Sequence, residues 1–166
     1  SRMGELTRNK HKSMVEIADN LPLIVYQINV LAQVGITDFV ITTGYMQNKL
    51  VSLIKRHFGG KYNFEFVFNS KYQTTNYIYS IYLTLDKLDE DLLLLHGDLF
   101  FTKDILKNLL LQEQSTIVID TTLPQPEKDF KAYVSEGRVK KIATYIHGNN
   151  CIACQPLYKL RKSDWR

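Results

Sequence analysis

Apolar residues recur along the chain with two spacings, one typical of helices and the other typical of strands. Intervals of three and four residues, which place apolar side chains on one side of a helix, occur in residues 21–35, 47–58, 76–88 and 102–112. Alternating, β-branched or wholly apolar runs, which favour strands, occur in residues 38–43, 63–69, 91–98 and 115–122. Residues 130–146 indicate a β-hairpin that turns at residues 135–137, and residues 158–166 indicate a strand end followed by a helix start.

The order of these elements predicts the fold class. Helices and strands alternate between residues 21 and 98, which requires crossover connections between strands that run in the same direction. The run 92–95 is apolar at every position, as expected for a central strand that is covered on both faces. We therefore predict an α/β protein, a Rossmann-like three-layer sandwich with a mostly parallel central sheet.

The two ends of the sequence do not match a complete fold of this kind. Residues 1–12 are a polar stretch with no strand before them, and Ser163 would begin a helix close to the last residue. No linker, repeat or low-complexity segment interrupts the chain. We expect residues 1–166 to form a single domain that lacks its first strand and its C-terminal elements.

The composition limits the classes of function. The 166 residues are 45% hydrophobic and 23% charged with a formal net charge of +4, which are ordinary values for one globular domain. The basic residues form small scattered clusters without interleaved aromatic residues, so nucleic-acid binding is disfavoured and a small anionic ligand fits the charge. No apolar run approaches the roughly 20 residues that a membrane span needs. Because no secretory signal is present either, we expect a cytoplasmic location.

The two cysteines, Cys151 and Cys154, form a single C-x-x-C motif. A zinc site would need two more ligands, and the four histidines are not spaced to provide them. A redox pair would be expected to open a helix after a strand, whereas Pro156 follows here. We expect two ordinary packed thiols.

Polar groups follow three of the predicted strands, at the carboxyl ends where open α/β sheets bind their ligands. They are residues 43–45, residues 69–76 and His96-Gly97-Asp98. Asp98 is well placed to hold Mg²⁺, yet it could equally cap the next turn or accept hydrogen bonds from backbone amides. Gly97 would let the backbone approach a ligand closely. Lys12 could contact a phosphate or be an ordinary solvated lysine.

Five segments, taken in order, link these groups. They are SRMGELTRNKHKSMVEI (1–17), PLIVYQINVLAQVGITDFVITTGY (22–45), NSKYQTTNYIYSIYL (69–83), LLLLHGDLFF (92–101) and KDFKAYVSEGRVKKI (128–142). Together they resemble the nucleotidyltransferase family, which includes the sugar-phosphate and choline-phosphate nucleotidyltransferases. The third and fifth segments are similar to its phosphocholine and aminoethylphosphonate cytidylyltransferase branch.

This resemblance implies the fold of the nucleotide-diphospho-sugar transferases and a Mg²⁺-dependent reaction. CMP would pass from CTP to a small phosphorylated acceptor of the phosphocholine or 2-aminoethylphosphonate type, and pyrophosphate would leave. Asp98 would hold the Mg²⁺, Arg2 and Lys12 would stabilise the triphosphate, and Lys131 would meet the acceptor phosphate or the α-phosphate. The residues that the resemblance assigns to nucleotide and acceptor binding are Tyr45, Asn76, Ser80 and Gly97.

The chain also departs from the family's pattern. His11 stands where the family usually has proline, and Thr144 where relatives often have lysine. The glycines of the phosphate loop would precede Ser1, and a second metal-binding aspartate would follow Arg166. A sugar-1-phosphate nucleotidyltransferase that uses another triphosphate, or a non-catalytic nucleotide-binding domain, therefore remains an alternative. The sequence does not identify the acceptor, and a homodimer would be unsurprising for a small enzyme.

Overall fold

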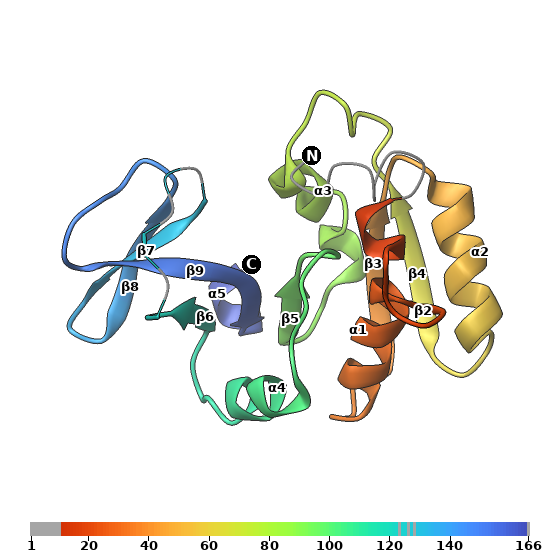
Figure 1. The fold of residues 1–166 in the computed structure, drawn as a ribbon, viewed down its shortest axis with the longest axis horizontal. Helices are drawn as coiled ribbons and strands as arrows, with labels where there is room; N and C mark the ends of the chain where they lie inside the picture. The colour runs from red at the N-terminus through yellow and green to blue at the C-terminus, as the bar shows by residue number, and fades with distance from the viewer. Residues whose placement is uncertain (1–10, 123, 126, 128, 166) are drawn as a thin grey trace. The chain divides into compact units, whose positions relative to one another are not determined.

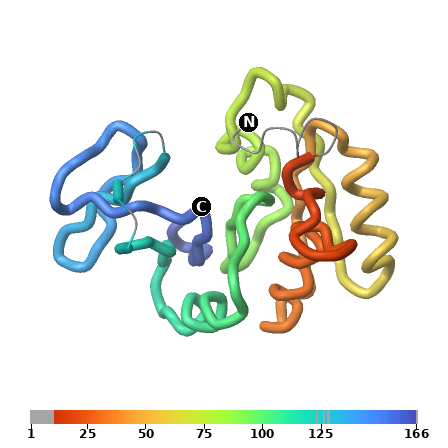
Figure 2. The backbone as a smooth tube through the Cα atoms, viewed as in Figure 1, coloured from red at the N-terminus to blue at the C-terminus, as the bar shows by residue number. Residues whose placement is uncertain are grey.

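The computed structural model of the chain describes residues 11–122, 124, 125, 127 and 129–165 (Figures 1 and 2). The chain divides into two compact units, one drawn from residues 1–90 and 97–107 and the other from residues 91–96 and 108–166. The sequence-based expectation of a single domain stays a prediction.

The first unit begins with a short turn and a two-stranded ribbon and continues with alternating helices and strands. Its elements are η2 (Lys12–Met14), β1 (Glu16–Ala18), β2 (Leu21–Pro22), α1 (Leu23–Ala32), β3 (Asp38–Thr43), α2 (Gln47–Phe58), β4 (Asn63–Phe68), α3 (Tyr77–Tyr82) and η3 (Leu85–Lys87). Helix α4 (Lys103–Leu110) begins in this unit and ends in the second. The four predicted helices and the strands β3 and β4 are confirmed.

The core of the first unit lies between the β3–β4 pair and the helices α1 and α2 (Figure 1). The two strands are parallel, with Asp38 opposite Asn63 and Thr43 opposite Phe68. Alternate side chains of a strand share one face, and those of β3 and β4 that face the helices pack against the buried apolar positions of α1 and α2. This cluster contains Ile24, Val25, Ile28, Leu50, Ile54 and Phe58, with Phe39, Ile41, Phe64 and Phe66 packed against it.

The ends of the helices follow the local sequence signals. Gly35, three residues after α1, has a φ of 91°, a left-handed conformation that glycine adopts without strain. The side chain of Asn76 accepts hydrogen bonds from the backbone N–H groups of Ile78 and Tyr79, so Asn76 is the N-cap of α3. Because β3 and β4 are parallel, as the predicted crossover order requires, their carboxyl ends lie at the same edge of the sheet.

The second unit is built on an antiparallel sheet in the order β5-β9-β7-β8, with β6 also paired to β9. Its elements are β5 (Leu92–Leu95), β6 (Thr116–Asp120), β7 (Lys131–Ser135), β8 (Arg138–Ala143), β9 (Cys151–Leu160) and α5 (Lys162–Trp165). The predicted hairpin is confirmed, because Glu136 and Gly137 both have positive φ, as a two-residue type I′ turn requires. Parallel pairing of the predicted kind is seen between β3 and β4, whereas the pairs that β5 to β9 form are antiparallel.

Both cysteines lie in β9 as free thiols, Cys151 buried and Cys154 partly buried. Burial raises the pKa of the Cys154 thiol to about 11, so this group stays protonated at neutral pH. The expectation of packed thiols is confirmed. Within the part of the chain that the structure describes, no helix combines the length and the apolar character that crossing a membrane would require.

Candidate functional site

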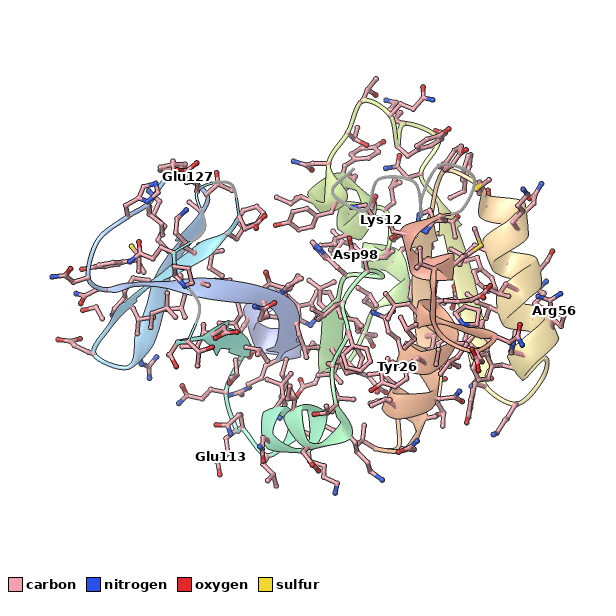
Figure 3. The ribbon with its side chains drawn as sticks, viewed as in Figure 1. Lys12, Tyr26, Arg56, Asp98, Glu113 and Glu127 are labelled. Carbon is pink, nitrogen blue, oxygen red and sulfur yellow. The ribbon has the colours of Figure 1, made fainter. Side chains whose placement is uncertain are left out.

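The turn that carries Lys12 meets the turn that carries Asp98 (Figure 3). Lys12 lies in η2, and Asp98 forms a turn with Gly97 shortly after β5. The Nζ atom of Lys12 is 3.2 Å from Oδ2 of Asp98, and the two side chains are 47% and 37% exposed. An ion pair this exposed contributes at most about 1 kcal/mol to stability. A charged ligand could therefore separate the two groups at little cost.

His11 fixes the turn that presents Lys12. Its Nδ1 atom accepts a hydrogen bond from the backbone N–H of Ser13 and lies 2.7 Å from the Ser13 hydroxyl, so the ring caps η2. Burial lowers the pKa of His11, an effect that Asp98 partly opposes and Lys12 adds to, and the neutral ring can keep accepting. Ser13 is buried, and a Cβ atom added at Gly97 would lie 3.5 Å from the Cβ of Ser13. The two turns are therefore in van der Waals proximity, and a small side chain at position 97 would still fit between them.

A second polar group lies at the carboxyl end of β4 and is centred on Asn69, whose side chain is buried. Its Nδ2 atom donates to the hydroxyls of Thr75 and Ser80 at 3.0 Å each, and its Oδ1 atom accepts from the backbone N–H of Lys71 at 2.9 Å. The backbone N–H of Asn69 donates to the carbonyl of Thr43 at the end of β3. One amide side chain thus ties the loop 69–76 to helix α3.

The residues that the sequence assigns to binding lie around these strand ends in the first unit. Tyr45 follows β3 and is 49% exposed. Asn76 is exposed at the start of α3, where its Oδ1 caps the helix, and Ser80 is partly buried and bonded to Asn69. A Cβ atom at Gly44 would lie 2.7 Å from the Cβ of Tyr72, so glycine is needed where the loop crosses the end of β3.

The remaining predicted residues are Arg2 and Lys131. Arg2 falls outside the described residues. Lys131 belongs to β7 in the second unit and is fully buried, with its ammonium donating to the carbonyls of Asp129 and Thr144 at 3.3 and 2.6 Å. A buried cation needs such partners, and the role assigned to Lys131 in binding phosphate stays a prediction.

A metal ion at Asp98 would need further ligands beside this carboxylate. Over residues 11–165, apart from positions 123, 126 and 128, no three His, Cys, Asp or Glu side chains form a group that could hold a metal. Mg²⁺ usually binds one or two carboxylates and takes its other oxygen ligands from water and substrate phosphates. A single accessible carboxylate beside a lysine fits such a site, and it does not fit a cage made of protein ligands alone.

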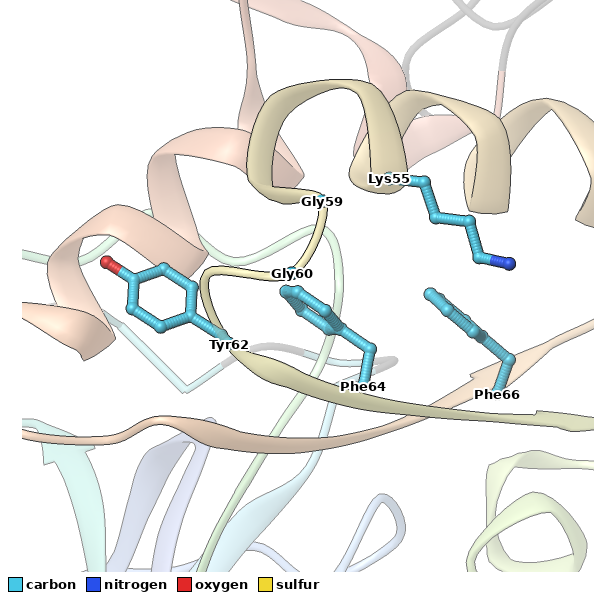
Figure 4. Close-up of a pocket in the computed structure, with 6 residues that line it drawn as sticks. All are labelled: Lys55, Gly59, Gly60, Tyr62, Phe64 and Phe66. Carbon is cyan, nitrogen blue, oxygen red and sulfur yellow. The ribbon is translucent and has the colours of Figure 1, made fainter.

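An apolar groove of about 340 Å³ lies away from these groups, between the end of α2 and β4 (Figure 4). Its lining residues are Lys55, Gly59, Gly60, Tyr62, Phe64 and Phe66. Of these residues, Phe64 and Phe66 belong to β4 and lie near its amino end and its middle, whereas Asn69 follows its carboxyl end. The groove includes none of the residues that the sequence assigns to binding or catalysis.

Sequence reasoning missed two residues that shape the site. Asn69 was part of a recognised segment, but only the structure shows that its side chain is buried and fully bonded. Gln27 is buried in the apolar helix α1, where its amide bonds to a backbone carbonyl beside Asp98. The available signal was an isolated polar residue between the apolar positions Ile24 and Ile28.

Comparison with known proteins gives consistent matches. Residues 1–140 match the family described as nucleotidyl transferase. The choline-phosphate cytidylyltransferase of Streptococcus pneumoniae is 32% identical over 108 residues, which are 65% of this chain and 44% of that protein. The CMP-5'-(3-aminopropyl)phosphonate synthase of Streptomyces rubellomurinus is 28% identical over 118 residues, which are 71% of this chain and 18% of that protein. The chain thus spans less than half of each of these relatives.

A solved structure confirms the fold. The inositol-1-phosphate CTP transferase of T. maritima superimposes with a TM-score of 0.74 over 95% of this chain and 64% of that one, at 21% identity. The predicted Rossmann-like α/β fold and the predicted resemblance to the cytidylyltransferase branch are both confirmed.

Proposed function

The chain belongs to the nucleotidyl transferase family, and we propose that its protein is a Mg²⁺-dependent cytidylyltransferase. It transfers CMP from CTP to a small phosphorylated acceptor of the phosphocholine or aminoalkylphosphonate type and releases pyrophosphate. The observation that carries this proposal is the accessible Lys12–Asp98 pair, in which a cation and a carboxylate lie 3.2 Å apart. Binding a magnesium–triphosphate complex needs both signs of charge at one place.

The chemistry mainly requires alignment and neutralisation of charge. An oxygen of the acceptor attacks the α-phosphorus of CTP, and the bond to the β-phosphate oxygen breaks as pyrophosphate leaves. Asp98 would hold Mg²⁺, whose contribution is to neutralise and orient the phosphates. Lys12 turns its ammonium from Asp98 toward the triphosphate, and Arg2 adds a second positive charge there.

The loop 69–76 and the start of α3 would bind the organic parts of the substrates. Asn76 uses its Oδ1 to cap α3, so its Nδ2 supplies the hydrogen-bond donors. Tyr45 offers an exposed ring on which a base or an alkylammonium group can stack. Ser80 supports the loop through Asn69 and donates its hydroxyl proton to a ligand. We further propose that Lys131 meets the acceptor phosphate. A cytoplasmic location and a homodimer are further predictions.

The test measures pyrophosphate release by the full-length protein with Mg²⁺ and each nucleoside triphosphate in turn. The acceptors are phosphocholine, aminoalkylphosphonates, inositol-1-phosphate and sugar-1-phosphates. Turnover with CTP and phosphocholine or a phosphonate is expected. Turnover with sugar phosphates alone would identify a sugar-1-phosphate nucleotidyltransferase, and nucleotide binding without any release would identify a non-catalytic domain.

A matched pair of variants tests the role of Asp98. Asp98→Asn removes the negative charge of the carboxylate and is expected to lower turnover by about 100-fold or more, as loss of a key electrostatic group does. Asp104→Asn makes the same chemical change in α4, where the side chain is 86% exposed and pairs with Lys107. This control should keep full activity. Equal activity of the two variants would contradict the metal-binding role of Asp98.

A further inference from the structure

The segment directly after Asp98 has no regular secondary structure, and side chains of α1 bind its backbone. Residues 99–102 lie between the Gly97-Asp98 turn and α4 and form neither helix nor strand. Gln27 donates from Nε2 to the carbonyl of Leu99 at 2.6 Å, and Tyr26 donates from its hydroxyl to the carbonyl of Phe101 at 2.8 Å. A buried backbone carbonyl needs a partner, and in this segment α1 provides it.

Gln27 is unusual among the residues of α1 because it is polar and 1% exposed. Its neighbours in the buried part of the helix are apolar, including Ile24, Ile28 and Leu31. Burying an amide is unfavourable unless its polar atoms are bonded, and an apolar side chain of similar length would fill the same space. The bond to Leu99 is one interaction that an apolar residue could not reproduce.

Tyr26 holds the same segment by different means. Its ring stacks on the ring of Phe100, with 4.8 Å between centroids and an angle of 11° between planes. Figure 3 labels Tyr26 and Asp98 in the first unit. Two consecutive residues of α1 therefore contact three consecutive residues after Asp98. The bond made by Gln27 acts on the peptide unit that joins Leu99 to Phe100, which is nearer to Asp98 than the carbonyl bound by Tyr26.

We propose that Gln27 is a positioning residue for the carboxylate of Asp98, an inference that rests on the proposed metal-binding role of Asp98. The Leu99 carbonyl is one residue beyond Asp98, so anchoring it limits the rotation of the backbone that carries the carboxylate. Gly97, on the other side, restricts the backbone little. The Lys12–Asp98 ion pair is too exposed to fix the carboxylate by itself. The partly buried hydrogen bond from Gln27 therefore sets where Asp98 presents its oxygens.

The experiment measures binding of Mn²⁺, a spectroscopic substitute for Mg²⁺, to the full-length protein with CTP by electron paramagnetic resonance. Gln27→Met keeps the length of the side chain and removes the donor. Gln27→Asn keeps the amide but shortens the side chain by one methylene group. This second variant replaces Gln27→Met in the experiment if Gln27→Met does not fold. Tyr26→Phe is the matched control, because it removes one hydrogen bond to the same segment and keeps the stacked ring.

Gln27→Met is expected to weaken Mn²⁺ binding by about tenfold, as loss of a residue that orients a metal ligand does. Tyr26→Phe should stay within about twofold of the unmodified protein. In an Asp98→Asn background, Gln27→Met should cause no further loss, because its effect passes through Asp98. In kinetics, the Mg²⁺ concentration for half-maximal activity should rise in Gln27→Met, with kcat restored at saturating Mg²⁺.

Two failures can be told apart. If Asp98→Asn weakens Mn²⁺ binding while folded Gln27 variants bind like the unmodified protein, the positioning role is overturned and the proposed function stands. The same follows if Gln27→Met causes an equal loss with and without the Asp98 carboxylate. If Mn²⁺ binding does not depend on Asp98 at all, the metal role in the proposed function fails and this inference fails with it.

Discussion

Replacing Asn69 by alanine is expected to release the loop 69–76 from helix α3. The side chain is 2% exposed and makes three hydrogen bonds, to Thr75, to Ser80 and from the backbone of Lys71. Through these bonds one amide connects the start of the loop with Thr75 near its end and with Ser80 in α3. The perturbation therefore tests whether the candidate binding loop owes its shape to Asn69.

The expected magnitude follows from the number of bonds. Each hydrogen bond contributes about 1 kcal/mol net, so Asn69→Ala should cost about 3 kcal/mol. Ser80→Ala removes one of the three bonds and should cost about 1 kcal/mol. Because the two side chains share a bond, the double variant should cost about 1 kcal/mol less than the two single losses combined.

Equilibrium unfolding in urea, followed by far-ultraviolet circular dichroism, measures these differences. Fluorescence of Trp165 is unsuitable, because this only tryptophan of the sequence belongs to the second unit. Hydrogen exchange at the backbone N–H of Lys71 gives a local measurement, and exchange there should accelerate in Asn69→Ala even if the loop opens without global unfolding. A loss below about 1 kcal/mol with unchanged exchange at Lys71 would refute the reasoning.

Three further predictions concern Gly44 and Cys154. Gly44→Ala would place a Cβ atom 2.7 Å from that of Tyr72, so the loop must move and CTP binding, measured by calorimetry, should weaken. The control is Gly148→Ser, at a glycine with open space around it and a φ of 126°, which should lower stability without changing CTP binding. Cys154, with its pKa raised to about 11 by burial, should react slowly with iodoacetamide at pH 8, and fast labelling would contradict its burial. The folded state holds the Cys154 proton more tightly than the unfolded state does. The contribution of this group to the free energy of unfolding is therefore fully present below pH 9.0 and should be lost as the pH rises toward about 11. Urea unfolding of the unmodified protein and of a Cys154→Ala control over this pH range isolates that contribution.

Much of the first unit could be predicted because its signals are local. Helix α2 occupies residues 47–58 as its apolar spacing predicts, and it ends at the glycines that follow. Strands β3 and β4 lie within the predicted ranges, and the Asn76 cap begins α3. In each case a few neighbouring residues contain the whole signal, whether a helical spacing, an alternation or a cap.

The second unit was predicted less completely. The hairpin of β7 and β8 was expected, because its turn has a strong local signature. The ten-residue strand β9 was recognised only at its end, although it pairs with β5, β6 and β7. Pairing with three strands depends on partners up to tens of residues away, and no short motif records it. For the same reason the antiparallel direction of these pairs was not expected.

The sequence by itself determined the family, the order of helices and strands, and the place of Asp98 after an apolar strand. These properties depend on the types and spacings of residues that are close together in the sequence. Only the tertiary structure decided that Lys12 meets Asp98, that Asn69 holds its loop and that Gln27 binds the carbonyl of Leu99. A polar side chain can bond to any backbone group that folding brings within about 3 Å, so its partner is settled by packing between distant segments.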